Sequence, residues 1–203
     1  YGKWDTSKFY GDFGLYGQTG EAAITNDKVD AGAYYAGFNL GYKFTAPFKV
    51  ELGFEYLSGK DQNDTDIKVK SFTPLFGTNH GFNGVMDYFY VGNHKNSVGL
   101  QDFYTKFIYD KNKWQVTLAP HVFYSAASVY NMATLEEQDS YLGTEIDLTA
   151  TYKMDKNFVI TGGVSKMFAS ETMEILKGGN INNCNNWAWV MVSFNPQLFT
   201  YKK

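Results

Sequence analysis

The sequence predicts an all-β protein, a transmembrane antiparallel up-and-down β-barrel, on three observations. Apolar residues alternate with polar or small residues in runs of about 10 to 14 residues. The connections between these runs alternate between short and long. Aromatic residues make up 18% of the 203 residues and charged residues only 19%, while the mean hydropathy is still −0.35. This composition suits a sheet with one face toward lipid and the other toward water.

The clearest alternation runs from Ala31 to Phe44, where every even position except Gly32 and Ala36 carries a large apolar side chain. The pattern resumes from Phe48 to Tyr56, and Leu57 is the one residue that does not fit it. A third run extends from Leu142 to Lys153. Strands of this length can cross a bilayer when they are tilted.

Weaker alternation predicts five further strands, which brings the total to about eight. They lie at about 7–19, 98–109, 114–125, 158–169 and 186–195. The connections 45–47, 110–113 and 154–157 are tight turns, whereas 20–30, 62–97, 126–140 and 170–185 are long. Outer-membrane barrels have short periplasmic turns and long outer loops. We therefore expect 62–97 to be an extracellular loop, so that a cysteine at Asn79, unlike one at Lys111, reacts with an impermeant maleimide on intact cells.

The segment from Asp87 to Gly92 also has the composition of a strand. One extra membrane crossing at 87–92 would give an odd number of strands. A second crossing near 68–76 would restore an even number, but Pro74 and the nearby glycines disfavour a strand there. We therefore interpret 87–92 as part of the long loop.

Several classes of protein are excluded by composition. The longest apolar run, Trp187 to Val192, has six residues, far fewer than the roughly 20 of a membrane helix. The net charge is −3, so no basic field indicates nucleic acid. A single cysteine, Cys184, excludes an internal disulfide framework. A soluble sandwich or lipocalin-like barrel is the alternative, but its interior would be overfilled by so many large apolar residues.

Five segments carry a resemblance to a known family. They are Phe72–Phe82, Met86–Gly92, Tyr141–Asp147, Met167–Ala169 and Asn186–Met191. In this order they resemble the C-terminal half of the alginate-export family of outer-membrane porins. The resemblance implies a monomeric barrel of roughly eighteen strands, of which residues 1–203, a single barrel domain, would be the C-terminal part. A complete eight-stranded barrel is the alternative. The resemblance also implies an arginine-rich constriction for alginate, yet this sequence contains no arginine.

The less apolar faces of the strands predict the lining of a pore. Its charged residues are Asp12, Lys43, Lys49, Glu51, Glu55, Asp102, Lys106, Glu145, Asp147 and Lys153. Six acids against four lysines give a net charge of −2. Such charges fit a hydrated channel, although cross-strand ion pairs that only stiffen the wall would give the same pattern. We expect weak selectivity that favours cations.

The other polar residues indicate no catalytic, cofactor or metal site. His80 and His94 have no carboxylate at a ligand spacing, and the oxygen-rich run from Asp61 to Asp66 lacks the glycine and distal glutamate of a calcium-binding EF-hand loop. His121 and Ser125 share a strand face, as in some lipid hydrolases. They are about 13 Å apart along a strand, too far for a nucleophile and its base.

The sequence therefore predicts a porin for passive passage of polar or polyanionic solutes in the outer membrane of a Gram-negative bacterium. A non-conducting barrel that serves as a scaffold or partner subunit of an envelope complex is the alternative. Trp114, Trp187 and Trp189 suit the aromatic girdles of such barrels. Lys95, Lys166 and Lys177 are candidates to contact lipopolysaccharide phosphates.

Overall fold

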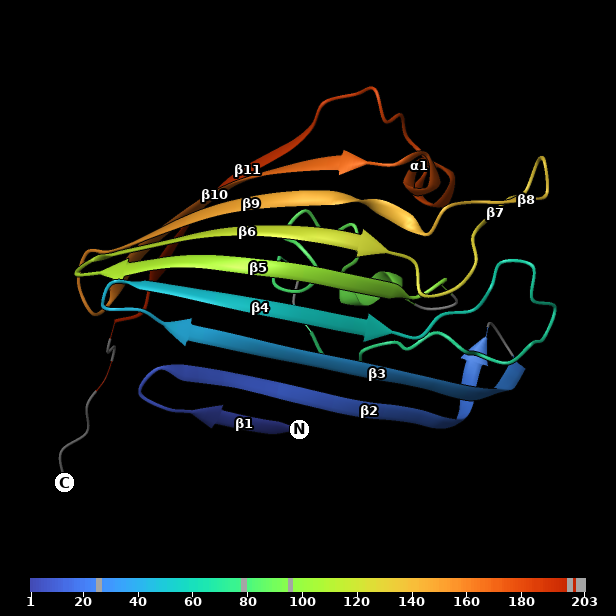
Figure 1. Ribbon diagram of the computed structural model, residues 1–203, viewed down its shortest axis with the longest axis horizontal. Coiled ribbons are helices and arrows are strands. Elements are labelled where there is room, and N and C mark those ends of the chain that lie inside the picture. Colours follow the sequence, from blue (N-terminus) through green and yellow to red (C-terminus); the bar gives the residue numbers. More distant parts are fainter. Residues whose placement is uncertain (25–26, 78–79, 95–96, 197–198, 200–203) are drawn as a thin grey trace.

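The structure is a computed structural model that describes residues 1–24, 27–77, 80–94, 97–196 and 199. In this part of the chain a curved sheet of nine antiparallel strands follows the order β1-β2-β3-β4-β5-β6-β9-β10-β11 (Figure 1). The strands of this sheet are β1 (Gly2–Asp5), β2 (Phe9–Ile24), β3 (Asp27–Lys43), β4 (Phe48–Leu57), β5 (Leu100–Lys111), β6 (Trp114–Tyr124), β9 (Tyr141–Lys153), β10 (Phe158–Ala169) and β11 (Asn185–Phe194). The predicted all-β, antiparallel architecture is confirmed.

The sheet is not closed. Among the described residues, β1 has only β2 as a neighbour and β11 has only β10. The alternative of a complete eight-stranded barrel is therefore wrong for this chain. The short strand β1 was not predicted; it pairs with Tyr10–Phe13, and four residues are too few to show a period.

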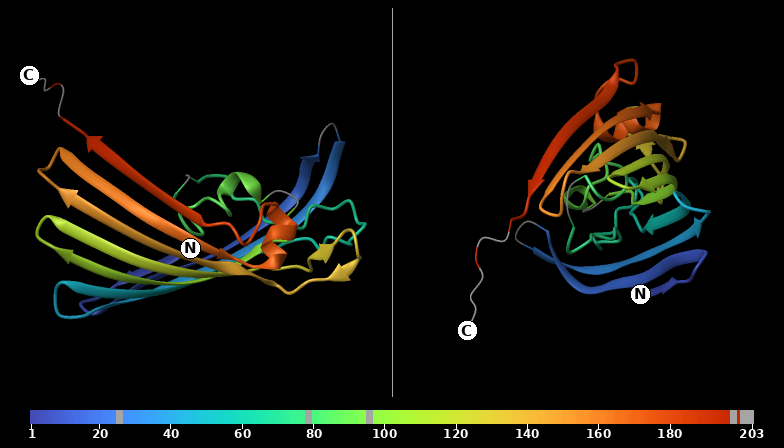
Figure 2. Two further views of the ribbon diagram at one scale, coloured as in Figure 1. Left: turned by 90° about the horizontal axis from the view of Figure 1, so that it is seen from above. Right: turned by 90° about the vertical axis from the view of Figure 1, so that its left-hand side faces the viewer.

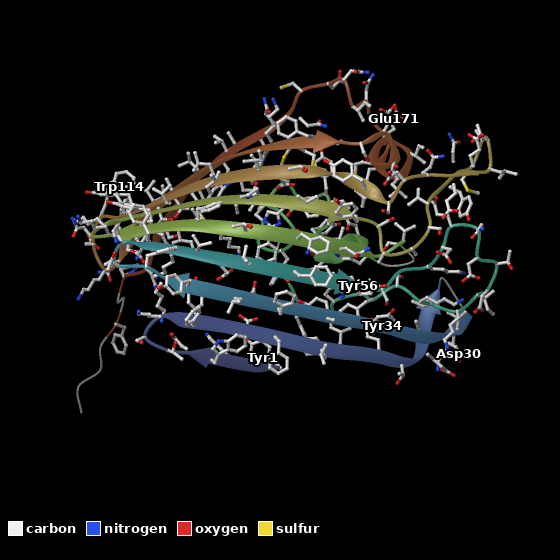
Figure 3. The ribbon with its side chains drawn as sticks, in the orientation of Figure 1. Tyr1, Asp30, Tyr34, Tyr56, Trp114 and Glu171 are labelled. Carbon is white, nitrogen blue, oxygen red and sulfur yellow. The ribbon has the colours of Figure 1, made fainter. Side chains whose placement is uncertain are left out.

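The convex face of the sheet is apolar and exposed. Leu15 and Val190, on strands near opposite edges, are 70% and 77% exposed. The rings of Tyr34 and Tyr56 stack 5.5 Å apart near the end of the sheet that carries the long connections. Trp114 lies at the end with the tight turns (Figure 3). The registers place the polar positions of each strand together on the concave face.

The predicted long loop 20–30 is wrong. The β2–β3 ladder continues from Gly20 paired with Ala31 to Ile24 paired with Asp27, so only residues 25 and 26 separate the two strands. No hydrophobic alternation marks these outer positions, because their backbone pairs beyond the apolar band. The sequence pattern therefore ends before the strands do.

The segment between β4 and β5 folds back over the concave face instead of extending away from the sheet (Figure 2). It contains one 3-10 turn, η1 (Val91–Asn93), and residues 87–92 form no strand, as predicted. Asn79, the labelling position expected to be extracellular, lies outside the described residues. We call residues 58–99 the inner segment.

A hydrophobic core holds the inner segment to the end of the sheet with the long connections. Phe72 and Phe89 of the inner segment cluster with Leu57, Leu100 and Phe123 of the sheet. Leu57, which breaks the alternation of β4, is therefore a core residue and only 1% exposed. Burial of five such side chains contributes on the order of 1.5–3 kcal/mol each before the cost of ordering the segment.

A helix, α1 (Glu171–Lys177), covers the same core with Met173 and was not predicted. Seven residues are too few for a visible helical period, but the boundaries follow familiar signals. Ser170 accepts a hydrogen bond from the Met173 amide at the N-terminus, and Gly178 at φ +74° ends the helix.

No described helix is long and apolar enough to cross a membrane. The connection between β6 and β9 holds the separate hairpin β7 (Tyr130–Asn131) and β8 (Glu136–Glu137).

Candidate functional site

All ten predicted pore-lining residues lie on the concave face, and eight of them fall into two groups. Of the other two, Asp12 accepts from the Asn39 side-chain amide at 3.2 Å, and Lys153 is exposed at the end of β9. Most of the lysines lie toward the tight turns and are paired with acids. Lys43 pairs with Asp5, and Lys49 approaches the Asp110 carboxylate at 3.9 Å. Farther in, the Lys106 ammonium is 3.2 Å from Glu51. These lysines are therefore partly neutralised by neighbours on the wall.

The second group is acidic and lies beneath the inner segment. It consists of Glu55 on β4, Asp102 on β5, and Glu145 and Asp147 on β9. Asp102 and Glu145 are fully buried, and Asp147 is 4% exposed. His121 on β6 lies among them, with its Nδ1 2.9 Å from Asp102 Oδ1. We call these four carboxylates the acidic group.

The inner segment is bound to the acidic group through residues 83–86, which we call the tip. The Asn83 side-chain amide donates to Glu55 Oε2 at 2.8 Å and to Asp102 Oδ2 at 3.2 Å. The backbone N–H groups of Val85 and Met86 donate to Glu145 Oε1 at 2.7 and 2.9 Å. These four hydrogen bonds hold the tip against side chains of three strands, β4, β5 and β9.

Gly84 allows this close approach. Its φ is +82°, and a Cβ there would lie 2.6–2.7 Å from the Glu145 carboxylate. Any larger residue would therefore be strained and would collide with the group that binds the tip. The acidic group thus binds the tip and holds the inner segment against the concave face.

A cavity of about 300 Å³ lies between the tip and the sheet. Asp147 and His121 line it together with Asn39, Tyr104 and Lys106. Phe82 and Asn83 contribute from the inner segment. The cavity is therefore polar on the side of the sheet and partly aromatic.

The other histidines are engaged with their own surroundings. His80 Nδ1 is 3.1 Å from Asp87 Oδ2, and its ring stacks on Trp187 with centroids 4.6 Å apart. His94 Nε2 is 2.9 Å from the Phe89 carbonyl oxygen, and burial lowers the pKa of His94 to about 4. Within the described ranges no three His, Cys, Asp or Glu side chains are grouped to hold a metal ion.

The oxygen-rich run from Asp61 to Asp66 is tied up internally. Lys70 lies 2.6 Å from Asp64 and 3.2 Å from Asp66, and hydrogen bonds from this lysine and from backbone amides lower the pKa values of both carboxyls. Asp61 accepts from the Ser128 amide at 2.7 Å. These carboxylates therefore stabilise the loops around them.

The structure gives His121 a different partner from the one the lipid-hydrolase pattern requires. Its ring contacts Asp102, whereas Ser125 accepts at its backbone carbonyl from the Gln101 side chain and is itself buried. Asp102 and His121 lie on the two arms of the β5–β6 hairpin, in a register that pairs Tyr104 with His121 and Asp102 with Phe123. The alternation in the sequence predicts the face of each residue but not this register, so the contact between His121 and Asp102 was not predicted.

The tryptophans and lysines proposed for the membrane interface divide between the faces. The face of Trp187 and Trp189 was open in the sequence, since their parity is that of the polar face. They pair with Ser165 and Gly163 on the concave face and so lie away from the convex surface. Lys166 lies on the convex face over the Phe168 ring. The side chain of Lys177 is exposed, its ammonium lies 5.3 Å from the centroid of the Phe89 ring, and desolvation of that ammonium lowers its pKa. Lys95 lies outside the described residues.

Comparison with known proteins gives one family match. The model of the family described as "Alginate export" matches residues 1–185. No curated protein matches the chain.

Proposed function

Because the chain belongs to the alginate-export family, we propose that its sheet is part of the wall of an outer-membrane porin in a Gram-negative bacterium. The porin passes polar or polyanionic solutes passively and catalyses no reaction. A family whose description is alginate export supports an envelope transport role, and the sheet supports a channel wall.

The observation that carries this proposal is the two-faced sheet. Each of its eight longer strands, of 10 to 17 residues, is long enough to cross a bilayer at a tilt. Large apolar side chains cover the convex face, whereas the charges gather on the concave one. A soluble sheet would bury the apolar face instead. Lipid contact outside and water inside explain both faces together.

The open edges at β1 and β11 support a wall that is wider than this sheet. Backbone groups without partners in hydrocarbon cost several kcal/mol each, so lipid cannot cover these edges. We propose that further strands pair with β1 and β11 and close a larger barrel. The concave face would then line its lumen, and the inner segment would narrow it.

The surroundings of the barrel follow from the two ends of the sheet. Lys166 lies near the end with the long connections, which we place outside the cell, where its ammonium would contact lipopolysaccharide phosphates. The tight turns would face the periplasm.

A second candidate is a non-conducting barrel that acts as a scaffold or as the partner of an envelope-complex protein. The observation in its favour is the hydrophobic core around Phe72 and Phe89, which covers the concave face at the end with the long connections. The passage would stay closed only while the inner segment remains packed in this core.

Planar-bilayer recordings of the full-length protein separate the two candidates, because only the porin gives stepwise conductance in KCl. A matched pair of variants tests the faces. Leu148 is on the convex face and Thr149 is its neighbour on the concave face. Leu148→Lys should destabilise folding into vesicles by about 2–4 kcal/mol, and Thr149→Lys by much less. Equal costs would contradict the assignment of the lipid face.

A further inference from the structure

We propose that the cavity under the tip binds the primary ammonium group of a small organic solute, with Asp147 as its main acceptor. The inference rests on the proposed channel function and names a class of solute for it. It runs opposite to the polyanion that the family description suggests.

Asp147 carries the proposal because its carboxylate is buried and without a partner. Neither of its two oxygens has a hydrogen-bond partner among the residues that the structure describes. His121 Nε2 lies 3.9 Å from Asp147 Oδ2, beyond hydrogen-bond distance but within the range of an ion pair when the ring is protonated. Glu145 Oε2, on the same face of β9, is likewise buried and unpaired within the described chain.

The positive groups that face the cavity make their closest contacts with other acids. His121 turns its Nδ1 to Asp102 at 2.9 Å, and Lys106 lies 3.2 Å from Glu51. Four carboxylates therefore share one imidazole beneath the tip. Burial of a carboxylate without a compensating partner is costly. A cation that enters the cavity would remove that cost at Asp147.

An ammonium group fits these surroundings better than a bare metal ion. The described residues provide no cluster of three metal ligands. An ammonium has three donors and needs acceptors at hydrogen-bond distance from several directions. Asp147, the hydroxyls of Thr117 and Thr149, and the Asn39 amide all line the cavity. Phe82 and Tyr104 add aromatic surface that attracts a cation or packs against a short alkyl chain.

The test uses n-butylammonium as the probe and n-butanoate as its anionic counterpart. Isothermal titration calorimetry on the full-length protein in detergent at pH 7 measures binding to the wild type and to two variants. Asp147→Asn removes the charge and keeps the shape of the side chain. Asp30→Asn makes the same change at an exposed aspartate that does not line the cavity and lies at the end of the sheet with the long connections (Figure 3).

We expect saturable binding of n-butylammonium, a loss of at least about tenfold in affinity in Asp147→Asn, and no change in Asp30→Asn. The absence of saturable binding, equal binding of n-butanoate, or equal affinities in the wild type and Asp147→Asn would overturn the proposal. Conductance of the same preparation in KCl separates the two claims. A protein that conducts but does not bind the probe refutes the ammonium site alone, and one that binds but does not conduct refutes the porin alone.

Discussion

Glu145→Ala should release the tip from the wall. Glu145 Oε1 accepts two backbone N–H groups, from Val85 and Met86, at 2.7 and 2.9 Å. A hydrogen bond contributes about 0.5–1.5 kcal/mol net. The loss of both, taken at the upper limit, weakens docking by about 3 kcal/mol, which raises the open population of the tip on the order of 100-fold.

Amide hydrogen exchange of Val85 and Met86 measures this opening directly in the full-length protein. Their exchange should be on the order of 100-fold faster in Glu145→Ala, and less accelerated in Glu145→Gln, whose amide oxygen still accepts hydrogen bonds. Glu51→Ala is the control, because Glu51 lies on the same face but contacts Lys106. Unchanged exchange in Glu145→Ala would refute the reasoning, as would equal acceleration in Glu51→Ala.

Three further predictions follow from the ends of the sheet, the inner segment and the wall. Cys184 is exposed in the connection between α1 and β11, so an impermeant maleimide should label intact cells, whereas Lys111→Cys in a Cys184→Ser background should stay unlabelled; the reverse result would invert the orientation. The pKa of His94 is lowered from 6.5 to about 4. The free energy of unfolding in urea should therefore be highest above pH 6.5 and should fall by up to about 3 kcal/mol as the pH drops to 4. His94→Asn should lack this dependence, and an identical profile would exclude His94 as its cause. Reversal potentials across a KCl gradient should show a weak preference for cations, which Lys106→Glu strengthens, whereas a strong anion preference would contradict the acidic lining.

The strands and their faces were predictable because a strand with one apolar and one polar face must alternate. The pattern therefore located β3, β4 and β9 well, and it placed all ten charged residues on one face. It failed where backbone pairing continues without apolar contrast, as at the outer ends of β2 and β3. It also could not detect α1 or β1, which are shorter than the window in which a period is visible.

The contact between the tip and the acidic group was not predictable from local patterns. Val85 and Glu145 are 60 residues apart, and no periodicity relates a loop to a strand on which it folds. Two signals pointed toward it nevertheless. Leu57 placed a large apolar side chain on a polar face, and Asn83-Gly84 offered the backbone freedom of a tight approach. Both make sense only once the inner segment lies inside the curve of the sheet.

The partners of the tip also constrain the order of assembly. Every neighbouring pair of long strands in the sheet is also consecutive along the chain, apart from the small β7–β8 hairpin between β6 and β9, so the wall can grow hairpin by hairpin from contacts of short sequence separation. The tip, in contrast, binds a residue of β9, and the core over it includes Met167 and Met173. The inner segment is thus synthesised early but docks late, after strands far downstream have paired. In the barrel that we propose, the interior would therefore stay open until these downstream strands have paired.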